Sequence, residues 1–248
     1  MEILLCIDDT DNIDSIGTGK LAALLSDALE NNGWGEFGPI TRHQLLVHQD
    51  IPYTSHNSSM CCTGKIKPEF FEMVIEFAQS FLRRESAPGS DPGLCIVNRG
   101  LLSDPDALIT FGKKAKTTVI TKEEAYQLAE RLAIHLSEHG GTGQGIIGAL
   151  AGCGLRLTGN DGRFRGHFQI DRRRERIKVC ELMQQTGVDV VKSLDGRVLD
   201  NEEVVQIGEK VKAVLQDSKS TLLVFAEQEI RTGERYWRTC TKQQLKIF

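Results

Sequence analysis

Residues 3–12, Ile-Leu-Leu-Cys-Ile-Asp-Asp-Thr-Asp-Asn, decide how this 248-residue chain begins to fold and where its chemistry is expected. The first five of these residues form a short apolar run bounded by polar residues, which is typical of a buried strand. Asp8, Asp9 and Asp11 follow at the carboxyl end of that strand. Carboxylates crowded there repel one another unless a cation or shared protons relieve the repulsion. Because hard oxygen ligands suit Mg²⁺, the segment predicts a magnesium site for a phosphate-bearing substrate.

A glycine-containing turn comes next, because Gly17-Thr18-Gly19-Lys20 precedes a helical pattern that runs from Leu21 to Asn31. We expect the backbone N–H groups around Gly17 and Gly19 to hold phosphate oxygens. Thr18 is a candidate phosphate ligand or transient phosphoryl acceptor, and Lys20 could neutralise phosphate charge. The turn is not a Walker A loop, whose spacing would need a glycine where Asp14 stands.

Each of these signals also has a simpler structural explanation. An Asp- and Asn-rich stretch such as residues 8–12, which includes Thr10 of the predicted nucleotide site, is also typical of a solvated turn. Thr18 could be an ordinary helix N-cap, and Lys20 a solvated side chain. The order of strand, acidic loop, glycine turn and helix within residues 3–31 favours the phosphate site.

Two further segments are candidates for the same site. Residues 139–145, His-Gly-Gly-Thr-Gly-Gln-Gly, precede an apolar helical pattern over residues 146–157. Gly143 and Gly145 are expected to present backbone N–H groups to phosphate, although an ordinary turn between elements also uses glycine. His56 and Asn57 begin a polar stretch that leads into an apolar strand, and they are candidate substrate or phosphate contacts.

The composition is that of an ordinary globular protein, with 40% hydrophobic and 26% charged residues. No apolar run approaches the length of a membrane span, and the first residues lack the basic region of a signal peptide, so we expect a cytoplasmic protein. The seven cysteines are scattered and contain no Cys-x-x-Cys pair. We therefore expect neither a structural zinc site nor a disulfide framework, and most cysteines fit the core.

A net charge of −4 argues against nucleic-acid binding by the whole surface. A local basic segment is nevertheless present, and its members are Arg163, Arg165, Arg172, Arg173, Arg174, Arg176 and Lys178. We assign Arg163 and Arg165 to a substrate phosphate. The alternative is a solvated charged face of a helix.

Hydrophobic periodicity predicts the α+β class, with mixed sheets and packed helices. Helices are expected over residues 68–83, 104–114, 121–138, 146–157 and 177–185, and strands over 40–48, 93–98, 117–121 and 221–227. Asp195-Gly196 predicts a hairpin turn, and residues 85–93 an exposed loop. We expect an ATP-binding catalytic core over residues 1–176 and an α/β extension over 177–248.

Three motifs together resemble the agmatidine synthetase (isoleucine-tRNA 2-agmatinylcytidine synthetase) family. The first is Ile7-Asp8-Asp9-Thr10-Asp11 with Thr18 downstream, the second is the polar stretch at residues 56–61, and the third is Gly-Ile-Ile-Gly-Ala-Leu-Ala at residues 145–151. The resemblance covers roughly residues 1–170 and corresponds to the N-terminal catalytic part of the family.

The resemblance implies a kinase-like ATP-dependent core joined to a ferredoxin-like portion. Members phosphorylate the ring carbonyl oxygen of a tRNA cytidine and then replace it with agmatine. The resemblance implies that Asp8, Asp9 and Asp11 bind Mg²⁺ and ATP, and that Thr18 takes part in phosphorylation chemistry. Full members also carry an OB-fold and a zinc ribbon, and we expect neither in these 248 residues. The partners implied are ATP and either tRNA or a small amine, and a homo-oligomer is compatible with the sequence.

The sequence thus predicts a Mg²⁺-dependent, ATP-using phosphoryl-transfer enzyme, a phosphotransferase or ligase whose acceptor no residue pattern identifies. Two other classes remain as alternatives. A regulatory module would bind nucleotide or metal without turnover, and an RNA-binding protein would use the arginine-rich segment. An aromatic content of 6% argues against the second alternative, because proteins that bind single strands usually stack bases on aromatic rings.

Overall fold

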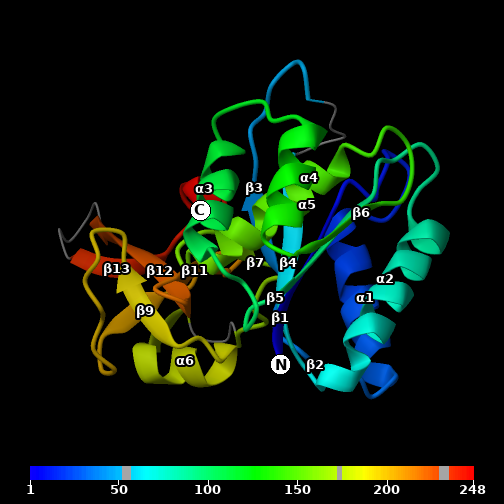
Figure 1. Cartoon of the computed structure of the whole chain (residues 1–248). Coiled ribbons are helices and arrows are strands. Elements are labelled where there is room, and N and C mark those ends of the chain that lie inside the picture. The colour runs from blue at the N-terminus through cyan, green and yellow to red at the C-terminus, as the bar shows by residue number, and fades with distance from the viewer. Residues whose placement is uncertain (52–56, 172–174, 229–234) are drawn as a thin grey trace. The chain divides into compact units, whose positions relative to one another are not determined.

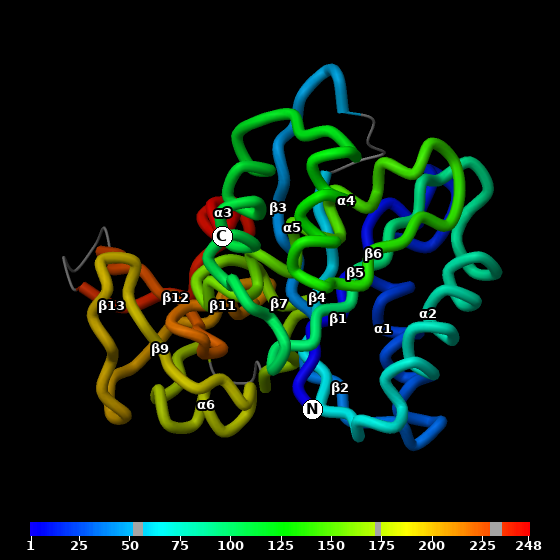
Figure 2. The backbone as a smooth tube through the Cα atoms, viewed as in Figure 1, coloured from blue at the N-terminus to red at the C-terminus, as the bar shows by residue number. Residues whose placement is uncertain are grey.

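The computed structural model describes residues 1–51, 57–171, 175–228 and 235–248. It divides into two compact units, Met1–Thr158 and Gly159–Phe248, which can be followed by colour along the chain in Figures 1 and 2. The predicted α+β class is confirmed. The functional boundary expected after residue 176 stays a prediction.

The first unit is an antiparallel sheet with helices on both faces (Figure 1). The strand order is β6-β5-β1-β4-β3, and β2 also pairs with β4. The strands are β1 (Glu2–Asp8), β2 (Gly35–Phe37), β3 (Thr41–Gln44), β4 (Ser58–Ile66), β5 (Gly93–Asn98) and β6 (His135–Glu138). The helices are α1 (Thr18–Asn31), a 3-10 turn η1 (Pro68–Phe70), α2 (Phe71–Glu85), α3 (Pro105–Lys114), α4 (Lys122–Arg131) and α5 (Gly145–Leu157).

Strand β1 lies at the centre because both of its faces are apolar. Ile3, Leu5 and Ile7 contribute to a buried cluster with α1 and α2. Leu4 and Cys6 contribute to a second cluster with α3, α4 and α5. Strands that are covered on both faces read as continuous apolar runs rather than as alternating ones. This double coverage explains why the opening run is apolar at every position up to the first aspartate.

Helix α5 packs closely on α3 because glycines stand where the two helices meet. A Cβ on Gly112 would lie 2.8 Å from the carbonyl oxygen of Ala151, and a Cβ on Gly154 would overlap the carbonyl oxygen of Leu108. Both obstacles are backbone atoms, so no side-chain rotation could relieve them. The apolar helix predicted over residues 146–157 is confirmed, and its glycines set its distance from α3.

The helix predicted over residues 121–138 begins as expected but ends early. Thr121 caps α4 by accepting a hydrogen bond from the N–H of Glu124 at 3.3 Å. The helix ends at Arg131 because Ala133 has a φ of 51°. The N–H of Ala133 donates to Glu130 O at 3.1 Å and that of Ile134 to Ala129 O at 2.9 Å, which is the Schellman pattern. Glycine usually occupies this position after a helix, so the alanine at residue 133 did not indicate where the helix ends.

The strand predicted over residues 117–121 is wrong. The N–H groups of Thr117 and Thr118 both donate to Lys114 O, at 3.0 and 2.8 Å, and so close the last turn of α3. β-branched residues favour strands only where a neighbouring strand is present to pair with them. Here the segment instead connects α3 to the cap of α4.

The second unit is a mixed sheet with one α-helix among its described elements. Its order is β7-β11-β12-β13-β10-β8, and β9 pairs in parallel with β12. The elements are β7 (Arg163–Phe164), β8 (Arg176–Lys178), α6 (Val179–Thr186), β9 (Val190–Ser193), β10 (Val204–Gln206), β11 (Ala213–Gln216), β12 (Lys219–Gln228), β13 (Arg235–Thr239) and η2 (Gln244–Ile247). The predicted turn at Asp195-Gly196 is present, with Gly196 at a φ of 98°.

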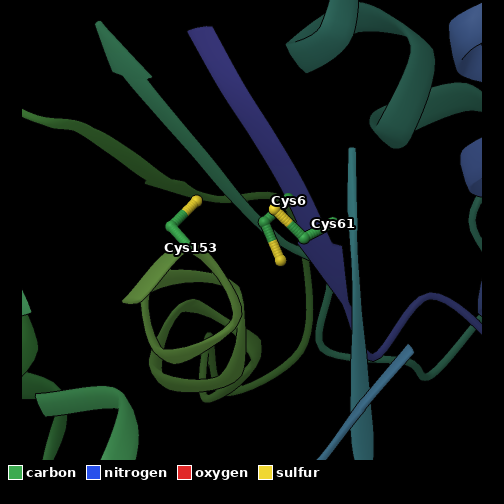
Figure 3. Close-up of side chains that lie close together, drawn as sticks. All are labelled: Cys6, Cys61 and Cys153. Carbon is green, nitrogen blue, oxygen red and sulfur yellow. The ribbon is translucent and has the colours of Figure 1, made fainter. Parts of the chain in front are cut away.

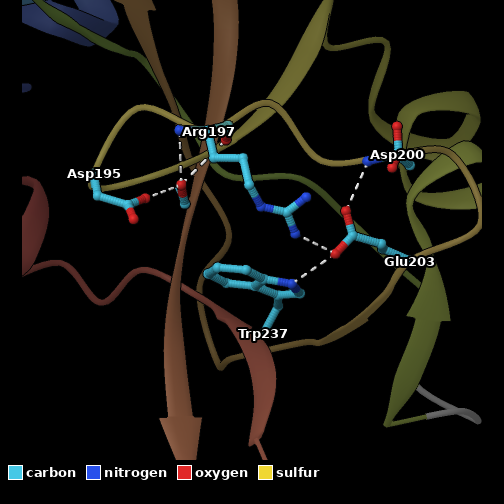
Figure 4. A network of polar contacts seen from close by, with 6 residues as sticks. Asp195, Arg197, Asp200, Glu203 and Trp237 are labelled. Carbon is cyan, nitrogen blue, oxygen red and sulfur yellow. Dashed lines mark hydrogen bonds and ion pairs between the residues drawn. The ribbon is translucent and has the colours of Figure 1, made fainter.

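A polar network ties the residue before β10, Glu203, and Trp237 of β13 to the loop after β9 (Figure 4). Glu203 accepts hydrogen bonds from the Arg197 guanidinium, from Trp237 Nε1 at 3.0 Å and from the Asp200 N–H at 2.8 Å. The Arg197 guanidinium also lies 5.2 Å from the centre of the Trp237 ring. Because one carboxylate receives three donors, it fixes the loop against the sheet.

Among the described helices of both units, none combines the length and apolar character needed to cross a membrane.

The glycine crossing of α3 and α5 generates a stability prediction. Gly154→Ala should lower the free energy of unfolding by about 1–3 kcal/mol, because the added methyl group must push two backbones apart. Urea denaturation at constant m-value measures the change. Gly100→Ala is the matched control, because a Cβ there would meet only Asn98 Oδ1 at 3.5 Å. Equal stability of the two variants would contradict this account of the crossing.

Candidate functional site

A pocket opens at the carboxyl end of β1 and collects most of the residues expected from the opening motif. Its empty volume is about 800 Å³, which includes space open to solvent. Its polar lining comprises Asp8, Asp9, Asp11, Thr18, Asp50, Asn57, Ser58, Thr118, Gln144, Gly145 and Gly148. Leu45, Ile51, Ala115, Val119, Ile120 and Ile147 line it with apolar side chains and methyl groups. Acidic, glycine-rich and apolar surfaces therefore meet in one cavity.

Asp8 and Asp9 hold protons more tightly than ordinary carboxyl groups do. Asp8 is only 8% exposed, and its burial, together with the charges of Asp9 and Asp11, raises its pKa to about 8. Burial and the charges of Asp91 and Asp11 raise the pKa of Asp9 to about 6. Crowded carboxylates in a low-dielectric pocket stabilise whichever species reduces their negative charge, either protons or a cation.

Asp9 also has an unusual backbone. Its φ is 50°, in the left-handed region that few residues other than glycine adopt. Asp tolerates this region better than most side chains. Asp8, Asp9 and Asp11, on either side of this sharp turn after β1, all line the same pocket. Local strain of this kind is common where a structure holds functional groups in place.

Thr18 lies at the first turn of α1 and faces the acidic loop. Its hydroxyl donates to Asp11 Oδ1 at 3.1 Å and accepts from the Thr10 N–H at 3.4 Å. Gly17 is the N-cap residue, and the N–H groups of Lys20 and Leu21 donate to its carbonyl. The N–H groups of Thr18 and Gly19, which precede these donors, have no acceptor within the helix. The start of α1 therefore combines a positive dipole end, a hydroxyl and a carboxylate.

The sequence predicts that Gly143 and Gly145 present backbone N–H groups to phosphate, and the start of α5 differs from this prediction. The N–H of Gly145 donates to Asp91 O at 3.1 Å, and the N–H of Ile147 donates to Gln144 O at 3.1 Å. These two donors are already used, so α5 offers the pocket its helix dipole rather than these N–H groups. Gly143 has a φ of 76° and forms the turn before the helix, and it is not among the pocket-lining residues.

Asp91 is a site residue that sequence reasoning missed. Its side chain accepts hydrogen bonds from the N–H of Thr142 and from Thr142 Oγ1, the latter at 2.6 Å. A Cβ on Gly141 would overlap the same carboxylate. Asp91 is 9% exposed although it belongs to the segment predicted as an exposed loop. It holds the second glycine-rich turn in place and adds its charge beside Asp9. Gln144 and Gly148 were also missed.

Several other predicted residues lie at the edge of the pocket or outside it. Thr10 is buried, and its Oγ1 has no hydrogen-bond partner among the described residues. Asn57 lines the pocket and donates to Leu46 O at 2.6 Å. Lys20 is exposed and does not line the pocket, and Gly19 lies beside it in α1. His56 lies outside the described residues.

The arginine-rich segment belongs to the second unit. Arg163 is buried and Arg165 is exposed, and burial lowers the pKa of Arg163 while the charge of Asp161 raises it. Arg176 stacks 5.0 Å from the centre of the Tyr236 ring, and Lys178 pairs with Glu202 at 2.7 Å. Residues 172–174 lie outside the described residues. The assignment of Arg163 and Arg165 to a substrate phosphate stays a prediction.

The carboxylate oxygens of the acidic pocket suit a magnesium ion as ligands. Its ligands would be carboxylate oxygens of Asp8, Asp9 and Asp11, and Mg²⁺ favours such oxygen ligands. A Cβ on residue 148 would overlap Asp8 Oδ2, so the glycine keeps space open at that carboxylate. No sulfur or imidazole group joins this set among the pocket-lining residues.

The raised pKa values predict how stability depends on pH when no metal is present. Between the ordinary value of 3.8 and the raised values of about 6 and 8, Asp9 and Asp8 keep protons in the folded chain that they lose in the unfolded chain. The contribution of these two groups to the free energy of unfolding should therefore fall as pH rises from about 4 to about 8, by at most about 1.4 kcal/mol per pH unit for each group. The lowered pKa values of His135 and His139 act in the opposite direction below about pH 6.5. Urea denaturation with EDTA at several pH values measures this slope.

Asp8→Asn should flatten that slope, because the variant has no proton to lose at residue 8. Asp14→Asn is the control, since Asp14 is an exposed carboxylate of the same loop. Adding Mg²⁺ should also flatten the slope, because the ion replaces the protons. A wild-type slope no steeper than that of Asp8→Asn between pH 6.5 and pH 8, which lies above the range where His135 and His139 contribute, would contradict the assignment.

Comparison with known proteins finds relatives over part of the chain. No family model matches the chain. Over 162 residues, 63% of this chain, it is 32% identical to TiaS of Methanosarcina acetivorans, a 2-agmatinylcytidine synthetase for an isoleucine tRNA. The matched part is 36% of that relative, so the chain spans about a third of the relative's length.

Solved structures agree on the fold. A TiaS structure in complex with its isoleucine tRNA and ATP matches 82% of this chain and 50% of its own, with a TM-score of 0.55 and 21% identity. A tRNA fluorescent labeling enzyme matches 98% of this chain and 70% of its own, with a TM-score of 0.55 and 18% identity. The resemblance predicted from the sequence is thereby confirmed: over 63% of its length this chain is similar to an isoleucine-tRNA 2-agmatinylcytidine synthetase.

Proposed function

We propose that this chain is an ATP-using enzyme that transfers a phosphoryl group with the help of Mg²⁺, and that the reaction takes place in the pocket at the end of β1. The observation that carries the proposal is the convergence of Asp8, Asp9, Asp11 and Thr18 on one cavity at the start of α1. Phosphoryl transfer depends mainly on positioning and on neutralising charge, and this set of groups suits both.

The acidic groups account for the handling of charge. A magnesium ion held by Asp8, Asp9 and Asp11 would offset the negative charge of the phosphates. The raised pKa of Asp8 supports this role, because a carboxylate that is costly to ionise alone gains most from a nearby cation. The chain's own groups then orient the triphosphate between the acidic loop and the start of α1, where the helix dipole favours an anion.

Thr18 is the residue best placed to receive a phosphoryl group. Its hydroxyl already donates to Asp11 Oδ1 at 3.1 Å. In the proposed step Thr18 Oγ1 bonds to the γ-phosphorus of ATP, its proton passes to Asp11, and the bond from the γ-phosphorus to the bridging oxygen breaks to release ADP. If Thr18 is instead a phosphate ligand, the acceptor is an exogenous group and Asp11 only orients the hydroxyl.

The apolar side of the pocket supports binding of the nucleoside. Leu45, Val119, Ile120 and Ile147 form an apolar wall of the same cavity as the aspartates. A purine ring buried there would leave its triphosphate pointing toward the acidic loop. Small-molecule sites commonly combine mostly apolar walls with a few placed polar groups. An apolar wall beside an acidic loop fits a nucleotide, which has both a ring and phosphates, better than it fits free phosphate.

The matched relative supports a second substrate from RNA metabolism. That relative is named for making 2-agmatinylcytidine in an isoleucine tRNA, and one matching structure holds that tRNA and ATP. We propose that the acceptor of this chain is likewise a tRNA nucleotide, with a small amine as co-substrate. The matched region is a part of the relative, so this assignment rests on the shared catalytic segment.

Turnover of ATP tests the metal-binding role. With Mg²⁺ present, Asp9→Asn should reduce ATP turnover by about 10²-fold or more, because a preorganised charge at the phosphates is lost. The assay measures labelled ADP or phosphate released from labelled ATP, with and without bulk tRNA and agmatine. Asp14→Asn should leave turnover unchanged. Saturable ATP binding without product in the wild-type protein would favour the regulatory-module alternative and contradict the proposal.

Labelling of the protein tests the role of Thr18. Incubation with γ-labelled ATP and Mg²⁺ should place label on the wild-type chain, and Thr18→Ala should abolish it. Thr121→Ala is the matched control, because Thr121 is also at a helix start but lies outside the pocket. If no label appears although turnover falls in Thr18→Ala, Thr18 is a phosphate ligand. Label that persists in Thr18→Ala would exclude it as acceptor.

A further inference from the structure

Three buried thiols lie close together on the face of the first unit's sheet that α5 covers (Figure 3). Cys6 is on β1, Cys61 on β4 and Cys153 on α5, and each is 0% exposed. Their sulfur atoms all lie within 4.8 Å of one another. Three separate elements therefore deliver one sulfur each to the same place. The sequence prediction that the cysteines are scattered core residues did not anticipate this grouping.

Strand register fixes this grouping. Cys6 stands directly opposite Cys61 in the β1–β4 ladder and opposite Cys95 in the β1–β5 ladder. Thr41 stands opposite Cys61 in the β3–β4 ladder. Residues that face each other across antiparallel strands project to the same face of the sheet. Cys95, Cys6, Cys61 and Thr41 therefore form a row across four strands, beneath α5.

A polar group without a partner points into the same space. A Cβ on Gly152 of α5 would overlap Cys6 Sγ and would lie 2.5 Å from Ser59 Oγ. Ser59 is fully buried, and its hydroxyl has no hydrogen-bond partner among the described residues. A buried hydroxyl that lacks a partner costs roughly 1–3 kcal/mol. The Ser59 hydroxyl and Cys6 Sγ therefore both lie against the backbone of Gly152.

The distances between the three sulfur atoms fit a metal ion. Metal–sulfur bonds of about 2.3 Å place sulfur ligands about 3.8 Å apart around a tetrahedral ion, the usual geometry of structural zinc, and about 4.0 Å apart around a trigonal ion. The sulfur atoms here would need to approach by at most about 1 Å from their upper limit of 4.8 Å. Thiolates without carboxylates select soft ions such as Zn²⁺ and Cu⁺ rather than Mg²⁺. The set therefore differs in kind from the aspartates of the pocket.

Charge balance favours the divalent ion. Arg156 donates to Thr41 Oγ1 at 2.9 Å, and Thr41 is the direct neighbour of Cys61 across the ladder. Three thiolates and Zn²⁺ leave one net negative charge, which the Arg156 guanidinium offsets. With Cu⁺ the same set would keep one uncompensated negative charge. A charge that is buried without compensation is costly, so the site favours Zn²⁺ over Cu⁺.

We propose that Cys6, Cys61 and Cys153 bind one thiophilic ion, Zn²⁺ in preference to Cu⁺, with the Ser59 hydroxyl beside it. Binding replaces the three thiol protons, which pass to solvent. The ion holds α5 on the sheet and is structural. The inference is independent of the proposed function, because none of these side chains lines the pocket.

Refolding with and without metal tests the proposal. The full chain is unfolded in urea with reductant and chelator, refolded anaerobically with Zn²⁺ or Cu⁺, desalted and analysed for metal by mass spectrometry. Wild-type protein should retain close to one Zn²⁺ per chain. Its thermal midpoint should rise by about 5–10 °C when the ion exceeds its Kd a hundredfold. Stoichiometric Cu⁺ with no retained Zn²⁺ would overturn the choice of ion.

Matched variants separate the cluster from other thiols. Cys153→Ser should lose the retained ion and the thermal shift. Cys62→Ser should keep both, because Cys62 is equally buried but contributes to the core on the opposite face of the sheet. The wild-type measurement decides the question even if Cys153→Ser fails to fold. Wild-type protein that retains no ion, equal retention by both variants, or a Cys6–Cys61 disulfide in non-reduced protein would each overturn the proposal.

Discussion

The close approach of α5 to the end of β1 is the constraint on which the rest of the first unit depends. A side chain at residue 145 would overlap Asp91 O, one at 148 would overlap Asp8 Oδ2, and one at 152 would overlap Cys6 Sγ. Glycine at these three positions lets helix backbone rest directly on the sheet. Protein interiors pack too densely to absorb even one added methyl group without movement. Gly145 and Gly148 also line the pocket, so helix backbone contributes directly to its wall.

That close contact also explains why the aspartates are destabilised in the absence of a ligand. Asp8 is covered by a helix whose contact there is a glycine, and Asp9 and Asp11 add negative charge beside it. The apolar clusters on both faces of β1 stabilise the strand enough to hold this unfavourable group. A ligand that neutralises the charge binds the folded chain alone, so its binding free energy adds to stability. A binding site of this kind is strained before its ligand arrives and relaxed afterwards.

Sequence reasoning succeeded where the evidence was local. The strand ending at Asp8, the turn before Thr18 and the apolar helix after Gly145 all follow from neighbouring residues, and all three are present. It failed where a distant contact decides the outcome. Asp91 meets Thr142, 51 positions away along the chain, and no local pattern in a Ser-, Pro- and Gly-rich segment indicates that partner. Ala133 ends α4 in a conformation normally taken by glycine, so the usual stop signal was missing.

The alternation of β1 relates the oxygen site to the sulfur cluster. Cys6 and Asp8 are two residues apart, so both project toward α5 and lie about 6–7 Å apart along the strand. Gly148 and Gly152, which face them, are four residues apart and about 6 Å apart along the helix. The spacing of the two side chains on β1 matches the spacing of the two glycines on α5. Fixing α5 at Cys6 therefore also fixes the distance between Gly148 and Asp8. An ion held by sulfur in the core would thus set the geometry of the carboxylates at the pocket, although it binds neither nucleotide nor phosphate.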